Sequence, residues 1–171
     1  MFKINIPTYH AKSVFDIDPC FYKKHGYKIV LIDLDNTLYS YKTKYPSERE
    51  ISLKERLEKE GIKLIIVSNN TGKRVSTYAS ALGVEYIPSI GKPFKWKLLK
   101  AVEKLPVRKE EIIMIGDQTV TDIAAANRAK IDNILTDKIV KEDQPTTHFN
   151  RMFDIPIRKK LIKKGLLREV D

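Results

Sequence analysis

Acidic side chains, hydroxyl groups and a lysine recur at four places along the chain, each after a short apolar run. Carboxylates gathered in one place repel one another unless a cation compensates their charge, as a hard divalent ion with oxygen ligands does. Such an ion attracts phosphate oxygens, which a hydroxyl and an ammonium group can hold from the other side. If the four places meet, they predict a metal-dependent phosphate site. The residues are Asp33, Asp35, Thr37, Ser68, Asn69, Lys92, Asp117 and Asp122.

The apolar runs predict the strands that would position these residues. Their apolar residues are consecutive rather than alternating, which is typical of strands buried on both faces of a parallel sheet. In an open α/β sheet, ligands bind outside the carboxyl ends of the strands, so residues that follow different strands meet at one edge. The predicted strands are 28–33, 63–68, 84–87, 112–115 and 131–135.

Helical patterns separate these runs, over residues 47–59, 73–82, 95–105 and 119–128. Ser47 is a good N-cap for the first of these helices, and Gly61 and Gly83 are suited to end the first two. Strands that alternate with helices favour a three-layer α/β/α fold with a mostly parallel sheet of about five strands. We predict one domain, residues 1–171, with its core over about 28–136 and flanking segments 1–27 and 137–171.

Four motifs resemble, in order, those of the haloacid dehalogenase (HAD) phosphohydrolase superfamily: DLDNT (33–37), VSNN (67–70), GKP (91–93) and GDQTVTD (116–122). Within it, the chain is similar to subfamily IIIA, and there to the YqeG type related to mitochondrial phosphatidylglycerophosphate phosphatases. The narrower resemblance rests on KSVFDID (12–18), on the GDQxxTD form of the last motif and on Asn127-Arg128. It covers about residues 6–151 and implies a HAD-like, Rossmann-type fold.

The resemblance implies how the acidic residues act. Asp33 would be the nucleophile that forms an aspartyl-phosphate, and Asp35 would protonate the leaving alcohol and then activate water. Mg²⁺ would be held by Asp33, Asp117 and Asp35, the last through its backbone carbonyl. This ion and Lys92 would neutralise the charge on the transferring phosphoryl oxygens.

The remaining motif residues would support this chemistry. Thr37 and Ser68 would donate hydrogen bonds, Ser68 directly to the phosphoryl group. Asn69 would bind phosphate together with Ser68 and Lys92. Asp122 lies on the next predicted helix and is counted among the catalytic residues. Its role would be to orient metal-bound water or Lys92.

The motif spacing leaves no room for a cap domain over the site. HAD enzymes place their specificity caps after the first or the second motif. Here residues 38–62 fit one helix with its turns, and residues 71–91 fit a helix and a short strand. We therefore predict a capless, open site, suited to a phosphate on a macromolecule or a membrane surface.

We expect a Mg²⁺-dependent phosphomonoester hydrolase, and the resemblance favours phosphatidylglycerophosphate, an anionic phospholipid at a membrane surface, as substrate. Two alternatives stay open. One keeps the chemistry on a nucleic-acid end or a soluble phosphometabolite, although nucleic acid is less favoured. The other is a basic nucleic-acid- or ribosome-binding protein with a vestigial site. The sequence predicts no particular oligomeric state.

The chain has 171 residues, and its 32 Lys+Arg against 22 Asp+Glu give a net charge of +10. A single cysteine, Cys20, excludes a disulfide scaffold, and the apolar runs are too short for a spanning helix. The first ten residues do not form a secretory signal. We therefore expect a cytoplasmic protein, with peripheral binding to the inner face of the membrane as an option.

Two segments outside the motifs allow more than one interpretation. Residues 158–168 hold six basic groups and no acid, and their helical pattern fits either a membrane-binding basic helix or a helix docked on its own domain. Residues 94–97 alternate aromatic and basic side chains, as in some nucleic-acid-binding segments. We predict instead that Trp96 packs in the core, as part of an apolar stripe with Leu99, Val102 and Leu105.

Overall fold

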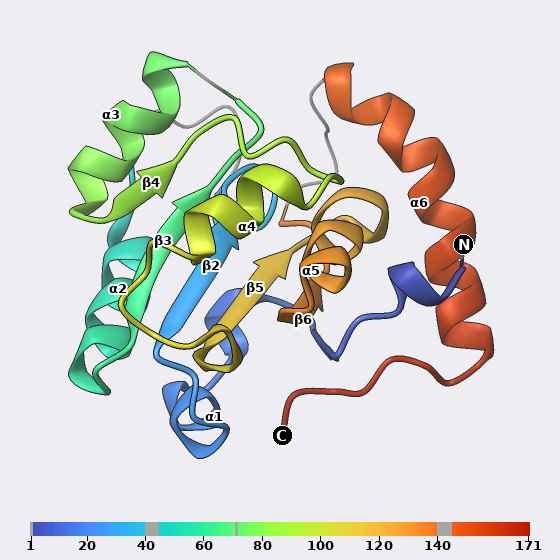
Figure 1. Ribbon diagram of the computed structural model, residues 1–171, viewed down its shortest axis with the longest axis horizontal. Coiled ribbons are helices and arrows are strands. Elements are labelled where there is room, and N and C mark those ends of the chain that lie inside the picture. The colour runs from blue at the N-terminus through green and yellow to red at the C-terminus, as the bar shows by residue number, and fades with distance from the viewer. Residues whose placement is uncertain (1, 40–44, 71, 140–144) are drawn as a thin grey trace.

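The computed structural model describes residues 2–39, 45–70, 72–139 and 145–171 (Figure 1). Six parallel strands form one sheet in the order β1-β6-β5-β2-β3-β4. The prediction of a mostly parallel sheet is confirmed, with one strand more than the five expected. The strands are β1 (Tyr9–Ala11), β2 (Ile29–Asp33), β3 (Lys63–Val67), β4 (Glu85–Ile87), β5 (Ile112–Gly116) and β6 (Asp132–Thr136).

Short helices other than α are labelled η. The helix predicted after Ser47 forms as expected, because the Ser47 side chain and Glu50 cap its first turn reciprocally. The helix predicted over 119–128 is instead a wide π-type turn followed by an α-helix. The helices are η1 (Phe2–Asn5), η2 (Val14–Asp16), α1 (Pro19–Lys24), α2 (Glu48–Lys59), α3 (Lys73–Leu82), α4 (Trp96–Val102), η3 (Lys109–Glu111), η4 (Thr119–Ile123), α5 (Ala124–Ala129) and α6 (Pro145–Lys163).

Two apolar layers sandwich the sheet, so the three-layer α/β/α prediction is confirmed. Successive side chains of a strand point to opposite faces. Val30 and Ile32 of β2 pack with α1, α2 and α3, whereas Leu31 packs with α4 and α5. Figure 1 shows α4 and α5 in front of the sheet. Between β2 and β3, the described residues form α2 and no cap domain.

Trp96 is not part of the core, and the prediction that it packs there was wrong. Its side chain is 70% exposed, and Phe94 nearby is 67% exposed. The helix predicted over 95–105 begins only at Trp96 and packs through Leu98 and Val102, which lie one helical turn apart. This register leaves Trp96 on the solvent side of the first turn.

The C-terminal helix α6 docks on its own domain. Leu161 is buried against Ile123 of η4 and Leu135 of β6. The next residue, Ile162, is 65% exposed. The helix ends at Lys163, and the chain then returns beside β1, where the His10 N–H donates to the Arg168 carbonyl at 2.6 Å. One of the two interpretations of the basic run, a helix docked on its own domain, is observed; binding of its exposed basic side chains to a membrane stays a prediction. Within the described residues, every helix is too short or too polar to cross a membrane.

Candidate active site

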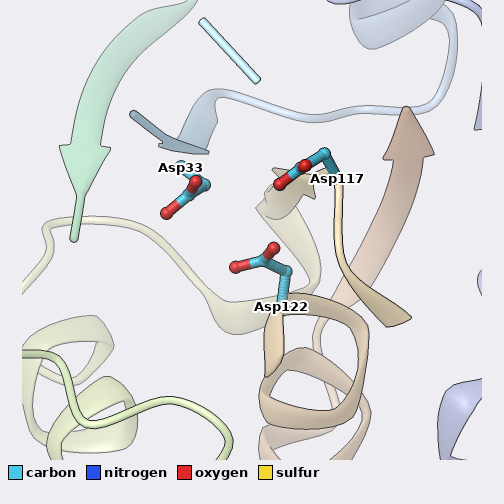
Figure 2. Close-up of side chains that lie close together, drawn as sticks. All are labelled: Asp33, Asp117 and Asp122. Carbon is cyan, nitrogen blue, oxygen red and sulfur yellow. The ribbon is translucent and has the colours of Figure 1, made fainter. Parts of the chain in front are cut away.

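Three carboxylates meet at the carboxyl ends of β2 and β5 (Figure 2). Asp33 is the last residue of β2, Asp117 directly follows β5, and Asp122 lies in η4. Because β2 and β5 are paired neighbours with Ile32 beside Ile115, their ends lie side by side. All three side chains are buried, and one oxygen from each lies within 4.8 Å of the others. Figure 2 shows them pointing toward one another.

A glycine makes this close approach possible. A Cβ atom placed on Gly116 would lie 2.3 Å from the Cβ atom and from the carboxyl carbon of Asp122. The Asp122 carboxylate also accepts a hydrogen bond from the Gln118 N–H at 3.1 Å. The glycine of the GDQ motif therefore provides the space that the carboxylate of Asp122 occupies.

Lys92 supplies a positive charge to the acidic cluster. Its buried ammonium group forms ion pairs with Asp33 and, at 2.7 Å, with Asp122. Asn69 holds the lysine backbone at both polar atoms: the Lys92 N–H donates to Asn69 Oδ1 at 2.8 Å, and Asn69 Nδ2 donates to the Lys92 carbonyl at 3.0 Å. The Asn69 side chain is thus engaged with Lys92, whereas the sequence predicted a contact with phosphate.

The charged groups of this cluster shift one another's pKa values. Burial raises the pKa of Asp33 well above its usual range, and Asp122 and Asp117 add to this rise, which Lys92 opposes. Burial lowers the pKa of Lys92, but the carboxylates of Asp122 and Asp33 outweigh it and raise that pKa overall. When the three carboxylates are ionised, Lys92 offsets one of their charges. A divalent cation would offset the other two, and carboxylate oxygens suit such an ion.

Asp35 lies next to this cluster, but its carboxylate is held from another side. Arg74 NH2 pairs with Asp35 Oδ1 at 2.5 Å, and Asn70 Nδ2 donates to Oδ2 at 3.0 Å. Arg74 NH1 also donates to the Tyr39 hydroxyl at 2.6 Å. Asn70 belongs to the motif VSNN (67–70) but was given no role from the sequence. Sequence reasoning missed Arg74, because nothing local distinguishes an arginine of α3 that faces Asp35 from one that faces solvent.

The two predicted hydroxyl donors are both buried at the site. Thr37 Oγ1 donates to Asp117 Oδ1 at 3.3 Å, so it orients one of the three clustered carboxylates. Ser68 follows β3, and its Oγ accepts a hydrogen bond from the Asn70 N–H at 3.1 Å. All eight residues predicted for the site therefore gather at this edge of the sheet.

Two residues of α6 hold the loop that carries Asp117. The buried Asp154 accepts hydrogen bonds at 2.6 Å from both the N–H and the hydroxyl of Thr119. Arg158 pairs with Asp154 at 3.1 Å and donates from NH2, at 2.6 Å, to the carbonyls of Asp117 and Thr136. Sequence reasoning missed this pair. Its four-residue spacing on a helix was the available signal.

Comparison with known proteins places this arrangement in a family. The family model for haloacid dehalogenase-like hydrolases matches residues 51–130. The "probable phosphatase YqeG" of Bacillus subtilis strain 168 is 34% identical over 163 residues, which cover 95% of each chain. Phosphatidylglycerophosphate phosphatase 1 of Arabidopsis thaliana is 25% identical over 174 residues. That match covers 94% of the present chain but only 49% of the plant protein.

Solved structures share the fold at lower identity. A hypothetical protein from Xanthomonas campestris has a TM-score of 0.52 at 13% identity, over 74% of the present chain and 73% of its own. The cobalt-bound form of deoxy-D-mannose-octulosonate 8-phosphate phosphatase from Haemophilus influenzae has a TM-score of 0.51 at 16% identity, over 80% and 90% of the two chains. The extended match to the B. subtilis protein, together with this fold, shows that the chain belongs to the YqeG-type phosphatases of the haloacid dehalogenase-like hydrolases.

Proposed function

We propose that this phosphatase is a Mg²⁺-dependent phosphomonoesterase that uses Asp33 as its nucleophile and phosphatidylglycerophosphate as its substrate. One observation carries the chemistry: three buried carboxylates meet around the ammonium group of Lys92 at one edge of the sheet. Asp33 and Asp117 would hold the ion together with the backbone carbonyl of Asp35. When bound, Mg²⁺ would neutralise charge on the phosphoryl oxygens as they are transferred.

In the proposed first step, the Asp33 carboxylate attacks phosphorus, the ester P–O bond breaks, and an aspartyl-phosphate forms. Lys92, fixed by Asn69 and paired with Asp122, stabilises the negative charge that the phosphoryl oxygens carry. Ser68 is buried at the end of β3, and its hydroxyl would donate a hydrogen bond to the phosphoryl group.

In both proposed steps, Asp35 moves the proton. It takes up a proton from solvent, against its ion pair with Arg74, and gives it to the leaving alcohol oxygen. Ionised again, it takes a proton from the water that attacks phosphorus, the bond between Asp33 and phosphorus breaks, and inorganic phosphate leaves. Arg74 and Asn70 hold its carboxylate in a defined orientation next to Asp33. A fixed orientation favours proton transfer, because the transfer needs donor and acceptor within hydrogen-bonding reach.

The lipid substrate is supported by the similarity to the plant protein named a phosphatidylglycerophosphate phosphatase, of which this chain spans about half. Two properties of the chain are compatible with it. The described residues place no cap domain over the site, and the net charge of +10 favours association with an anionic surface.

The proposal is tested by phosphate release from phosphatidylglycerophosphate in mixed micelles, beside a 5′-phosphorylated oligonucleotide and p-nitrophenyl phosphate. We expect Mg²⁺-dependent release, abolished by EDTA, with the highest kcat/KM on the lipid. A higher kcat/KM on the oligonucleotide would overturn the lipid assignment. Turnover that persists in EDTA after dialysis would overturn the metal dependence.

Gly116→Ala is expected to lower phosphatase activity on the order of 10²-fold, because displacing a positioned group by about 1 Å can cost that much. The added methyl group overlaps the Asp122 side chain, which must then shift and change its ion pair with Lys92. Steady-state kinetics with p-nitrophenyl phosphate would measure the loss. Gly72→Ala is the matched control, since its nearest new contact is an ordinary 3.9 Å. Wild-type rates in Gly116→Ala would show that Asp122 tolerates displacement.

Arg158→Gln is expected to raise the Mg²⁺ concentration at half-maximal activity by about tenfold, as loss of a residue that orients a metal ligand typically does. The substitution removes the guanidinium group that holds the Asp117 carbonyl and pairs with Asp154. Activity at saturating Mg²⁺ is expected to change much less. The adjacent, exposed Lys159→Gln is the control. Equal Mg²⁺ dependence in both variants would argue against the positioning role of Arg158.

A further inference from the structure

An apolar groove lies beside the candidate active site, between α5, α6 and the N-terminal segment. Its volume is 590 Å³. Figure 1 shows the N-terminal segment running between α5 and α6. Apolar side chains from each of these elements, from η4 and from the loop before α4 line it. They include Ile4, Pro93, Val120, Ala124, Phe153 and Ile157.

The groove shares two segments with the catalytic cluster. Pro93 lines the groove and directly follows Lys92, whose ammonium group pairs with Asp33 and Asp122. Thr121 lines the groove and directly precedes Asp122. A molecule seated in the groove would therefore lie next to the residues that contact a phosphate group at Asp33.

The charged and aromatic residues around the groove favour an anionic, partly apolar partner. Arg128 is the charged residue among those lining it, and none of the lining residues is acidic. The exposed Lys160 follows Phe153 by seven residues on α6 and so lies on the same helix face. Phe94 and Trp96, just after Pro93, are 67% and 70% exposed. Exposed aromatic residues among basic ones are typical of surfaces that bind a lipid interface.

We propose that this groove docks on the surface of an anionic lipid bilayer and takes the apolar part of a phospholipid, whose phosphate group then reaches Asp33. This inference extends the proposed function and rests on its assignment of a lipid substrate. The sequence had offered residues 158–168 as a membrane-binding helix, but Leu161 of this segment is buried against the domain. The proposed apolar contact with the membrane is instead the groove.

Binding to vesicles tests the apolar contact without turnover. The whole protein is sedimented with phosphatidylglycerol vesicles, and the partition coefficient is compared among wild type, Phe153→Ser and Ile155→Ser. Phe153 lines the groove and is 49% exposed, whereas Ile155 is 52% exposed on the same helix and does not line it. We expect Phe153→Ser to bind about tenfold more weakly, the effect of losing one partly buried aromatic side chain, and Ile155→Ser to bind like wild type. Equal binding by the two variants would overturn the proposal.

The charge contribution is tested separately. Lys160→Gln is expected to weaken binding to phosphatidylglycerol vesicles about fivefold, since a basic group near an anionic surface contributes about that much. Lys59→Gln, an exposed lysine of α2, carries the same charge change and is expected to bind like wild type. If the two variants weaken binding equally, the contact is a general charge effect and the proposed docking face is wrong.

Turnover separates this inference from the proposed function. If wild type binds phosphatidylglycerol vesicles through Phe153 but hydrolyses only p-nitrophenyl phosphate, the lipid substrate is wrong while the docking surface stands. If wild type and Phe153→Ser hydrolyse phosphatidylglycerophosphate in vesicles at equal rates, the proposed function stands and the docking surface is wrong. Phe153→Ser and Ile155→Ser are both expected to hydrolyse p-nitrophenyl phosphate at the wild-type rate, because other residues form the catalytic cluster.

Discussion

Asp33→Asn is expected to lower phosphatase activity on the order of 10⁴-fold or more, because an amide cannot replace the carboxylate nucleophile. The substitution preserves the shape of the side chain and removes one acidic group from a buried cluster. Burial, Asp122 and Asp117 raise the pKa of Asp33, and Lys92 opposes the rise. In Asp33→Asn, Lys92 keeps its ion pair with Asp122 and no charge is left buried without a partner. We therefore expect an unfolding temperature close to that of wild type.

The measurement is phosphate release at saturating Mg²⁺, beside a thermal unfolding curve of the same preparation. Asp16→Asn is the matched control, since Asp16 is an exposed aspartate of η2 that does not belong to the acidic cluster. Wild-type, Mg²⁺-dependent activity in Asp33→Asn would refute the nucleophile assignment. Loss of activity with a large drop in unfolding temperature would indicate a damaged fold and would contradict the stability argument.

Lys92→Met is expected to reduce both activity and stability. Removing one partner of a buried ion pair typically costs about 3–5 kcal/mol, because the remaining charge stays buried without compensation. Here two buried carboxylates, Asp33 and Asp122, lose the ammonium group that pairs with them. The phosphoryl oxygens lose the same charge, which is expected to lower kcat about 10²- to 10³-fold.

Mg²⁺ distinguishes this explanation from simple loss of packing. Because Lys92→Met increases the uncompensated negative charge of the cluster, Mg²⁺ is expected to raise its unfolding temperature by more than that of wild type. Lys97→Met, an exposed lysine five residues further along, is expected to leave both kcat and the unfolding temperature unchanged. If Mg²⁺ stabilised wild type and Lys92→Met equally, the charge of Lys92 would not be coupled to the metal site.

Much of the site was predictable because parallel strands follow a general rule. The carboxyl ends of neighbouring parallel strands lie at one edge, so residues that directly follow them meet. Asp33 and Asp117 obey this rule through the pairing of β2 with β5, although 78 residues separate the end of one strand from the start of the other. The N-cap Ser47 was predictable for a different reason, since a helix cap depends only on residues within one turn.

Strand direction and residue type did not predict which distant group a polar side chain contacts. Asn69 turns to the backbone of Lys92, and the Asp35 carboxylate turns to Arg74. Strand β1 is only three residues long and is formed by pairing with β6, more than 120 residues later. No local pattern specifies such contacts.

By itself, the sequence determined which residues reach the edge of the sheet, because spacing and strand burial are properties of short segments. Only the tertiary structure decided what surrounds them. The docking of α6 brings Asp154 and Arg158 to the Asp117 loop. The packing of α4 through Leu98 leaves Trp96 exposed, three residues after Pro93 of the groove. Both outcomes depend on how whole elements pack against one another, since the direction of a side chain follows from the rotation of its helix on the sheet.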